Sequence, residues 1–170
     1  MHDELTEIDI KKTQEEIDYR IIELTPKLKA ELQQARELGD LSENDEYRTT
    51  RRELNVNYSR IRYLKNMINT AVIIKVDTRA EPENTIGLFD KITLKYDDDD
   101  EEQVISIVTT LRSDPLKGFI SKESPFGRAL IGRQCGERVK IDANEKLSYY
   151  VEIIKIEKGE DDDSLEINKY

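Results

Sequence analysis

The sequence of 170 residues predicts an α+β protein, in which an N-terminal antiparallel helical hairpin (a coiled coil) precedes a small α+β domain. Two patterns predict this fold class. Apolar residues recur at helical spacing up to about residue 70, and short runs typical of β-strands follow. The composition agrees, because 36% hydrophobic and 38% charged residues without any Trp is lean for one globular core and typical of long exposed helices.

Each arm of the predicted hairpin carries one narrow apolar stripe. The first arm runs from about residue 5 to 38 and the second from 43 to about 69. Positions three and four residues apart share a helix face, so we expect the stripes to be buried against each other. Pro26 interrupts the first arm after Thr25, a good N-cap, and predicts a bend or restart rather than an end. The stripe residues are Ile17, Ile21, Leu24, Leu28, Leu32 and Ala35, then Tyr47, Leu54, Tyr58, Ile61, Leu64 and Ile68.

A short connection joins the two arms. Gly39 can take the left-handed conformation that closes the first helix, and Ser42 can cap the second. Glu43 and Asp45 would then lie in the first turn, where the helix dipole favours acids. So short a connection makes the arms antiparallel neighbours. Without the residues of this tip, the hairpin could equally be a coiled coil used for association.

The pattern changes to β after Thr70. Strands are predicted at residues 71–76, 90–96, 103–109, 138–141 and 147–157, with a short helix near 125–131. We therefore place the hairpin at residues 1–74, with an acidic tip at 38–46, and the α+β domain at 75–158. The acidic run 97–102 predicts a solvated hairpin loop, and residues 159–170 predict an acidic, disordered tail.

The composition excludes several classes of protein. A single His2 and a single Cys135 exclude a disulfide framework, a Cys-based zinc site and Ser-His-Asp catalysis. Neither a run of about 20 apolar residues nor a signal-peptide pattern is present, so we expect a soluble cytoplasmic protein. The net charge of −10 argues against wrapping nucleic acid nonspecifically.

Basic residues nevertheless gather in the second arm. Residues 46–65 contain six basic side chains against two acidic ones. A solvated helix face with partners one turn away explains most such stripes, but near the tip a phosphate contact is the other interpretation. The six are Arg48, Arg51, Arg52, Arg60, Arg62 and Lys65, and Arg36 lies behind the tip on the first arm.

The tip is the most informative part of the sequence. It carries four carboxylates in seven residues, at Asp40, Glu43, Asp45 and Glu46. The helix dipole explains acids in the first helical turn but does not explain Asp40, which precedes the cap. Two carboxylates on a turn can supply oxygen ligands to Mg²⁺ but are too few for a whole site. Any metal chemistry would therefore be completed by the active site of another molecule.

Two stretches resemble the signatures of the bacterial Gre transcript cleavage factors. Residues 35–47 read ARELGDLSENDEY, and residues 120–132 read ISKESPFGRALIG. Pro26 also stands where the family has a proline. The resemblance covers about residues 5–157, with both motifs in the right order and spacing, and the chain is identified as a member of this family.

The resemblance implies a fold, a partner and a role. The C-terminal domain is expected to be FKBP-like and to dock at the rim of the secondary channel of bacterial RNA polymerase, while the hairpin reaches the catalytic centre. The factor would stimulate the polymerase's own cleavage of a backtracked RNA 3′ end. It would be an accessory protein rather than an enzyme, a monomer, with no membrane and no small-molecule substrate.

The resemblance also assigns roles to residues of the tip. The two tip acids of the family fall on Asp40 and Glu43, which would help to hold the second Mg²⁺ of the polymerase and position the attacking water. In two-metal hydrolysis one ion activates the nucleophile and the other stabilises the leaving oxygen. We expect the free protein to bind no Mg²⁺.

The family's basic positions fall on Arg36 and Arg51. With Arg48 and Arg52 they would guide the RNA end through phosphate contacts, which carry no sequence information. Tyr47 would pack at the base of the tip or contact RNA, and packing is the interpretation that we favour.

In the C-terminal domain, Ser124, Pro125, Phe126 and Gly127 match the loop that the family uses near its polymerase contact. The alternative is structural: Gly127 serves a turn and Phe126 fills the core. The sequence departs from the family pattern at Thr109–Thr110 and at residues 142–145, which puts details of the docking surface in doubt.

Three functions remain open from the sequence. The intact pair Asp40 and Glu43 favours a factor that stimulates cleavage. The additional acid Asp45 keeps open a Gre-like regulator that occupies the channel but inhibits or tunes the polymerase, since some inhibitory relatives carry additional tip acids. The third is a coiled-coil adaptor without a polymerase role.

Overall fold

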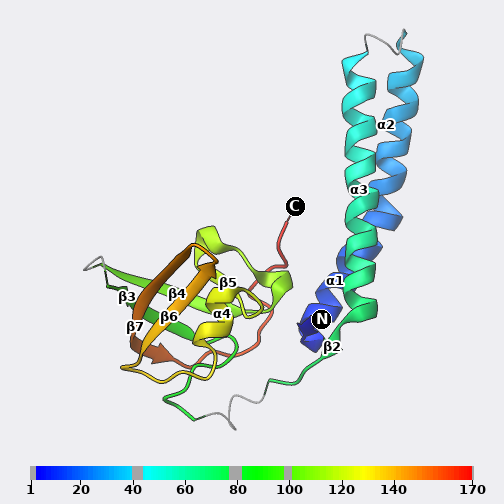
Figure 1. The fold of residues 1–170 in the computed structure, drawn as a ribbon. Helices are drawn as coiled ribbons and strands as arrows, with labels where there is room; N and C mark the ends of the chain where they lie inside the picture. Colours follow the sequence, from blue (N-terminus) through cyan, green and yellow to red (C-terminus); the bar gives the residue numbers. More distant parts are fainter. Residues whose placement is uncertain (1–2, 40–43, 77–81, 98–100, 170) are drawn as a thin grey trace. The chain divides into compact units, whose positions relative to one another are not determined.

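The computed structural model describes residues 3–39, 44–76, 82–97 and 101–169 (Figure 1). The chain divides into a helical unit, residues 10–71, and a sheet unit formed by residues 1–9 together with 72–169. The predicted fold class, a helical hairpin followed by an α+β domain, is confirmed. The expected domain boundary differs, however. The N-terminal segment belongs to the sheet unit because β1 (Glu4–Leu5) pairs in parallel with β2 (Val72–Ile73).

The helical unit is a hairpin of two unequal arms. The first arm consists of α1 (Glu7–Tyr19), the π-helical turn η1 (Arg20–Leu24) and α2 (Thr25–Glu37), and the second is α3 (Asp45–Thr70). Figure 1 shows α2 lying side by side with the part of α3 that is nearer the tip. Apolar residues of both helices are buried where they meet, including Leu28 and Ala35 on α2 and Leu54 on α3.

The turn η1 results from Pro26. Proline has no N–H to donate to the carbonyl of Ile22, and the chain widens by one residue so that the Thr25 N–H bonds the carbonyl of Arg20 instead. The Thr25 hydroxyl donates to the same carbonyl at 2.7 Å. The first arm therefore continues past Pro26 in helical conformation, and the prediction that Thr25 acts as an N-cap is wrong. The widened turn changes which positions of the first arm face the second arm. Ile21, which was expected to be buried, is 43% exposed.

Polar side chains fill part of the seam where apolar ones were expected. Tyr58 is 38% exposed, whereas Asn57 and Arg60 are each only 2% exposed. Arg60 belongs to the basic run but does not face solvent. It makes a two-pronged contact with Glu16, from Nε to Oε1 at 2.9 Å and from Nη2 to Oε2 at 3.1 Å. An ion pair across the arms therefore helps to hold this part of the hairpin, in addition to the buried apolar residues Ile17 and Leu64.

The network continues from Glu16 through Arg20 to Asn57. Arg20 donates to Glu16 at 2.7 Å and to Asn57 Oδ1 at 3.0 Å, and Asn57 Nδ2 donates to the Thr25 hydroxyl at 2.8 Å. Burial acts to raise the pKa of Glu16, but the hydrogen bonds from Arg60 and Arg20 outweigh it and lower that pKa below its usual value. Three of these residue pairs cross between the arms, Arg60 with Glu16, Arg20 with Asn57 and Asn57 with Thr25, and together they favour one register of the hairpin.

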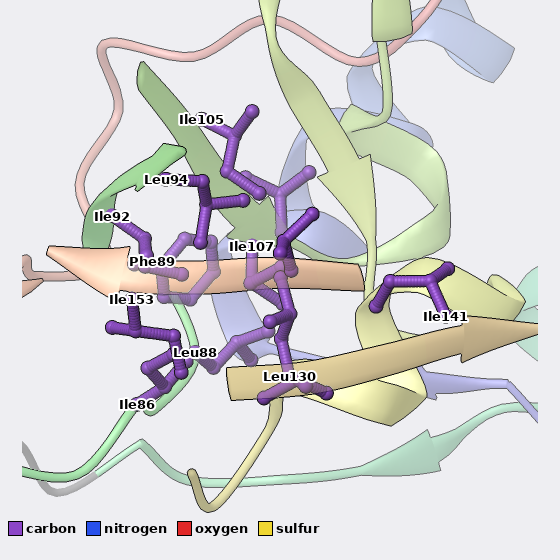
Figure 2. Close-up of a cluster of buried hydrophobic side chains, with 13 residues drawn as sticks. Ile86, Leu88, Phe89, Ile92, Leu94, Ile105, Ile107, Leu130, Ile141 and Ile153 are labelled. Carbon is purple, nitrogen blue, oxygen red and sulfur yellow. The ribbon is translucent and has the colours of Figure 1, made fainter. Parts of the chain in front are cut away.

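The sheet unit is built on five strands in the order β5-β4-β3-β7-β6. Neighbours are antiparallel except β4 and β5, which run parallel. The strands are β3 (Lys91–Tyr96), β4 (Glu102–Val108), β5 (Phe119–Ser121), β6 (Arg138–Asn144) and β7 (Leu147–Glu157), with the helix α4 (Pro125–Leu130) and the short turns η2 (Thr110–Arg112) and η3 (Pro115–Lys117) between them. Thirteen buried apolar residues form the core, gathered from the strands, the segment 86–89 and α4 (Figure 2).

The acidic tail differs from the prediction of disorder, because residues 159–169 pack against the sheet unit. Gly159 donates its N–H to Asp90 at 3.0 Å, and a Cβ at this position would lie 1.9 Å from the carbonyl oxygen of Phe89. Further along, Ile167 is 9% exposed and the Asn168 N–H bonds the carbonyl of Leu111 at 2.6 Å. These contacts give the tail a fixed path.

One buried arginine binds the tail at Asp161 and Asp162. Arg112, 2% exposed, pairs with Asp9 at 2.6 Å and with Asp161 at 2.7 Å, and donates to the carbonyl of Asp162 at 3.1 Å. Asp9 also accepts from the N–H of Thr6 at 3.0 Å. A buried guanidinium needs acceptors on several sides, so the N-terminal segment and the tail are both held by this side chain.

Candidate functional site at the hairpin tip

The tip lies where α2 ends and α3 begins. Leu38 closes α2 with its side chain 70% exposed, and Gly39 has a positive φ of 136°. The predicted tip acids Asp40 and Glu43 lie outside the described residues, as does Ser42. The second arm starts later than predicted, with Asn44 rather than Ser42 as the N-cap and Asp45 as the first helical residue.

Asn44 holds both arms with one side chain. Its Oδ1 accepts the N–H of Tyr47 at 2.9 Å, which caps α3. Its Nδ2 donates to the carbonyl of Ala35 on α2 at 2.6 Å. That carbonyl belongs to the last turn of α2, where helical acceptors lose their regular partners. The local sequence alone did not indicate this residue, because Ser42 and Asn44 can both cap a helix.

Tyr47 packs across the arms behind the tip. It is half-buried, and the guanidinium carbon of Arg36 lies 5.9 Å from the centre of its ring. A hydrogen bond from Arg36, with the positive charges of Arg36 and Arg51, lowers the pKa of the Tyr47 phenol, and burial opposes this only in part. The side chain thus joins α3 to the basic residue at the end of α2.

The four arginines expected to guide RNA are exposed. Arg36 lies in the last turn of α2, and Arg48, Arg51 and Arg52 lie on α3. Positions 51 and 52 lie three and four residues after position 48, so each of them neighbours Arg48 on the helix surface. Arg48 pairs weakly with Asp45, with an N–O distance of 3.7 Å. The arrangement gives a positively charged surface behind the tip that can meet phosphate groups.

The described acids of the tip are open to solvent. The side chain of Asp45 is 94% exposed, and Glu46 is also exposed. Over the described ranges, no three residues of the types that ligate metals lie together. Carboxylate oxygens are nevertheless the donors that Mg²⁺ prefers. The described acids of the tip, Asp45 and Glu46, therefore present exposed carboxylate oxygens to solvent.

The predicted docking loop has clear structural roles. Ser124 caps α4, accepting the Gly127 N–H at 3.0 Å and donating to the carbonyl of Ser121 at 2.7 Å. A Cβ on Gly127 would lie 2.2 Å from that same carbonyl oxygen, so only glycine fits. Phe126 packs on the core, with its ring centre 6.3 Å from that of Tyr149. Pro125, at the first helical position, is exposed. The loop is thus a rigid turn that leaves Pro125 on the surface.

The described part of the chain contains no helix that is long and apolar enough to cross a membrane. The protein consists of two units, a hairpin of long helices and a small curled sheet.

Two family models match this chain in sequence. The model described as "Transcription elongation factor, N-terminal" matches residues 4–73, and "Transcription elongation factor, GreA/GreB, C-term" matches residues 81–158. Proteins called Transcription elongation factor GreA from Oenococcus oeni and Leuconostoc mesenteroides are 36% and 39% identical to it. The alignments cover 91% and 86% of this chain and 94% and 91% of those proteins.

A solved structure is also similar. The crystal structure of GreA factor homolog 1 of Thermus thermophilus is 21% identical, has a TM-score of 0.42, and matches 93% of this chain and 100% of that chain. The sequence matches identify the class: the chain belongs to the GreA/GreB family of transcription elongation factors.

Proposed function

We propose that this protein binds bacterial RNA polymerase through its secondary channel and stimulates the polymerase's intrinsic, Mg²⁺-dependent cleavage of backtracked RNA 3′ ends. Arrested complexes would then resume synthesis from a new 3′ end. The observation that carries the proposal is the sequence pair Asp40 and Glu43, which follows the last residue of α2 and precedes the first residue of α3, within residues 4–73 that match the family model.

The tip acids would complete a metal site that the polymerase begins. Asp40 and Glu43 would offer carboxylate oxygens to the second Mg²⁺ and orient the water that attacks the phosphodiester. When bound in the polymerase active site, Mg²⁺ supplies the positive charge that activates the water and stabilises the leaving oxygen. The exposed position of the described part of the tip supports this role, because an unobstructed tip can enter another molecule's site.

The arginines and the docking loop would position the tip. Arg36, Arg48, Arg51 and Arg52 would neutralise phosphates of the extruded RNA without reading its sequence. Pro125, on the rigid turn capped by Ser124, would contact the polymerase at the channel rim. The polymerase would then provide the catalytic machinery, and this protein would act as an accessory factor.

The test is RNA cleavage in stalled, backtracked complexes of the cognate polymerase with Mg²⁺. We expect the wild type to speed the release of short 3′ fragments. The double variant Asp40→Asn/Glu43→Gln should lose at least about 100-fold of that stimulation, the range expected when charges that act in a transition state are removed. The matched control Asp45→Asn/Glu46→Gln removes the same number of charges nearby and should retain most activity.

Polymerase affinity separates catalysis from docking. We expect the Asp40→Asn/Glu43→Gln variant to compete with wild type for the polymerase almost as well as wild type itself. A variant at Ser124 and Pro125 should instead bind more weakly. Full stimulation by the tip variant would rule out the catalytic role, and unchanged affinity of the loop variant would rule out the loop as a docking element.

A second function within the same family is supported by Asp45. Its side chain is almost fully exposed and adds a further acid to the tip. If the protein slows nucleotide addition without speeding cleavage, it is a channel-binding regulator of the polymerase. The Asp45→Asn variant should then relieve the inhibition.

A further inference from the structure

Thr110, the first residue of η2, contacts both ends of the chain. Its hydroxyl donates to Asp3 Oδ1 at 3.2 Å, and its carbonyl accepts the side-chain amide of Asn168 at 3.4 Å. Asn168 also donates its backbone N–H to the adjacent carbonyl of Leu111 at 2.6 Å. The carbonyl of Asp3 accepts the N–H of Val72 at 2.9 Å. The N-terminal segment and the tail are therefore both fixed where they meet Thr110.

The same hydroxyl reaches the base of the docking loop, residues 124–127. Thr110 Oγ1 lies 3.3 Å from Ser121 Oγ, and this Ser121 oxygen accepts the N–H of Glu123 at 3.1 Å. The carbonyl of Ser121 accepts both the N–H and the hydroxyl of Ser124, at 3.0 and 2.7 Å. Ser121 therefore connects Thr110 to the turn that starts the loop.

The hydroxyl groups of this chain of hydrogen bonds donate in one order. The ionised carboxylate of Asp3 only accepts, so Thr110 gives it its single hydroxyl proton. Ser121 then donates to Thr110 Oγ1, while its own oxygen accepts from Glu123. Because each bond polarises the next, the chain that runs from Glu123 to Asp3 is cooperative.

We propose that Thr110 is a positioning residue for polymerase docking: through Ser121 it holds the docking loop in the orientation that presents Pro125. The inference rests on the proposed function, in which this loop contacts the polymerase. The apparent affinity of a loop falls with the fraction of molecules in its binding conformation, so a loop that is held in place binds more tightly. Asp3 and Asn168 both lie outside residues 4–73 and 81–158, which the family models match.

The loop has other attachments, which limit the expected effect. Lys122 donates its N–H to the carbonyl of Val108 at 2.9 Å, and its side chain forms an ion pair with Glu4. These contacts remain when the Thr110 hydroxyl is removed, so the loop should loosen rather than unfold. We therefore expect the loss of one net hydrogen bond, which represents a factor of about five.

The experiment compares Thr110→Val, which removes the hydroxyl but keeps the branched shape, with Thr110→Ser, which keeps the hydroxyl. Stimulated cleavage is measured against the concentration of the factor. For Thr110→Val we expect the half-saturating concentration to rise about fivefold, while the maximal rate stays at the wild-type value. Thr110→Ser should stay near wild type in both quantities. A lower stability of Thr110→Val with an unchanged half-saturating concentration would make Thr110 a residue of the fold alone.

The neighbouring Thr109 provides a matched control. Its side chain is fully buried, and its hydroxyl has no hydrogen-bond partner among the described residues. Thr109→Val is the same substitution one position away and should leave the half-saturating concentration unchanged. Equal shifts in Thr109→Val and Thr110→Val would overturn the proposal.

A double-mutant cycle with Ser121→Ala tests whether the two hydroxyls act together. Ser121→Ala also removes the acceptor of the Glu123 N–H, so it should raise the half-saturating concentration at least as much as Thr110→Val. If Thr110 acts through Ser121, the double variant should bind like Ser121→Ala alone. Independent effects, which would multiply to about 25-fold or more, would contradict this route.

A measurement on the free protein separates this proposal from the proposed function. By NMR, the amide of Glu123 should exchange with water about fivefold faster in Thr110→Val than in wild type, and at the wild-type rate in Thr109→Val. If wild type fails to bind polymerase, the function proposed above is wrong and the docking role of Thr110 fails with it. If wild type binds but Thr110→Val changes neither exchange nor affinity, only the positioning role is wrong.

Discussion

Among the described residues, the helical unit buries Arg60 and the sheet unit buries Arg112, but the two arginines have different partners. In the hairpin, Arg60 and Arg20 share one acid, Glu16. In the sheet unit one arginine pairs with two acids, because Arg112 forms ion pairs with both Asp9 and Asp161. The hairpin network lies among a few buried apolar residues such as Ile17 and Leu64, whereas Arg112 lies beside a large apolar core, 5.0 Å from the ring centre of Phe89.

The comparison shows what buried ion pairs contribute in this protein. Such pairs add little net stability, since desolvation offsets most of the attraction, but removing one partner leaves a costly unpaired charge. In the hairpin the pairing selects one register of the arms. In the sheet unit it fastens the N-terminal segment and the tail to the sheet. The consequences of losing each arginine should therefore differ in size and place.

The largest effect is expected for Arg112→Met. It leaves the fully buried Asp9 without its guanidinium and should lower the free energy of unfolding of the sheet unit by about 3–5 kcal/mol. Hydrogen exchange by mass spectrometry reports this as faster exchange in sheet peptides. The control Arg128→Met, at an exposed ion pair, should have almost no effect. Equal stability of Arg112→Met and wild type would contradict the role given to Arg112.

Removing the tail should have the next largest effect. Deletion of residues 160–170 removes Asp161 and the buried Ile167 but leaves Asp9 paired with Arg112. We expect the sheet unit to lose about 2–3 kcal/mol, comparable to truncating one buried apolar side chain. Urea denaturation of full-length and shortened chains measures the difference. If stability were unchanged, the tail would be a passive extension.

A smaller, pH-dependent effect is expected in the hairpin. Glu16→Gln should cost about 1.5–3 kcal/mol near neutral pH, the range for hydrogen bonds to charged groups. The folded-state pKa of Glu16 lies below its usual value of 4.5, so its contribution is present above that pH and is lost as the pH falls through the folded-state pKa. Exchange of hairpin peptides in the two proteins should therefore converge on acidification. A difference that persists at low pH would show that Glu16 does not act through its charge.

The smallest effect is expected at the tip and does not involve stability. Arg36→Gln should raise the pKa of the Tyr47 phenol towards its usual value, because the main cause of its lowering is the hydrogen bond from Arg36. An NMR titration of labelled tyrosine side chains resolves this group from the other tyrosines. Arg62→Gln, on the same helix but away from Tyr47, is the control. An unchanged Tyr47 titration would show that the two side chains do not interact.

Sequence patterns predicted the long elements well because their signals are local. The hairpin arms and the strands of the sheet follow from apolar spacing within each segment. Strands β1 and β5 were not predicted, since runs of two and three residues carry no periodicity. Asn44, rather than Ser42, caps α3, and its side chain also bonds the Ala35 carbonyl across the hairpin. That contact is not visible from the capping residues themselves.

Burial of charge was the main source of error. Arg60 was grouped with exposed arginines because its partner Glu16 lies 44 positions away in the sequence. The tail was expected to be disordered from its acidic composition, although Arg112 provides a buried partner for Asp161. The role of Asp40 and Glu43 rests on the sequence motif alone, because both residues lie outside the described part of the chain.

The central claim is that the tip acids act on RNA while the rest of the protein binds the polymerase. The most direct test adds increasing amounts of Asp40→Asn/Glu43→Gln to backtracked complexes that contain a fixed amount of wild type. We predict that the variant suppresses stimulated cleavage in proportion to its excess, because it occupies the polymerase without completing the metal site. Failure to suppress cleavage, or cleavage by the variant itself, would contradict this division of roles.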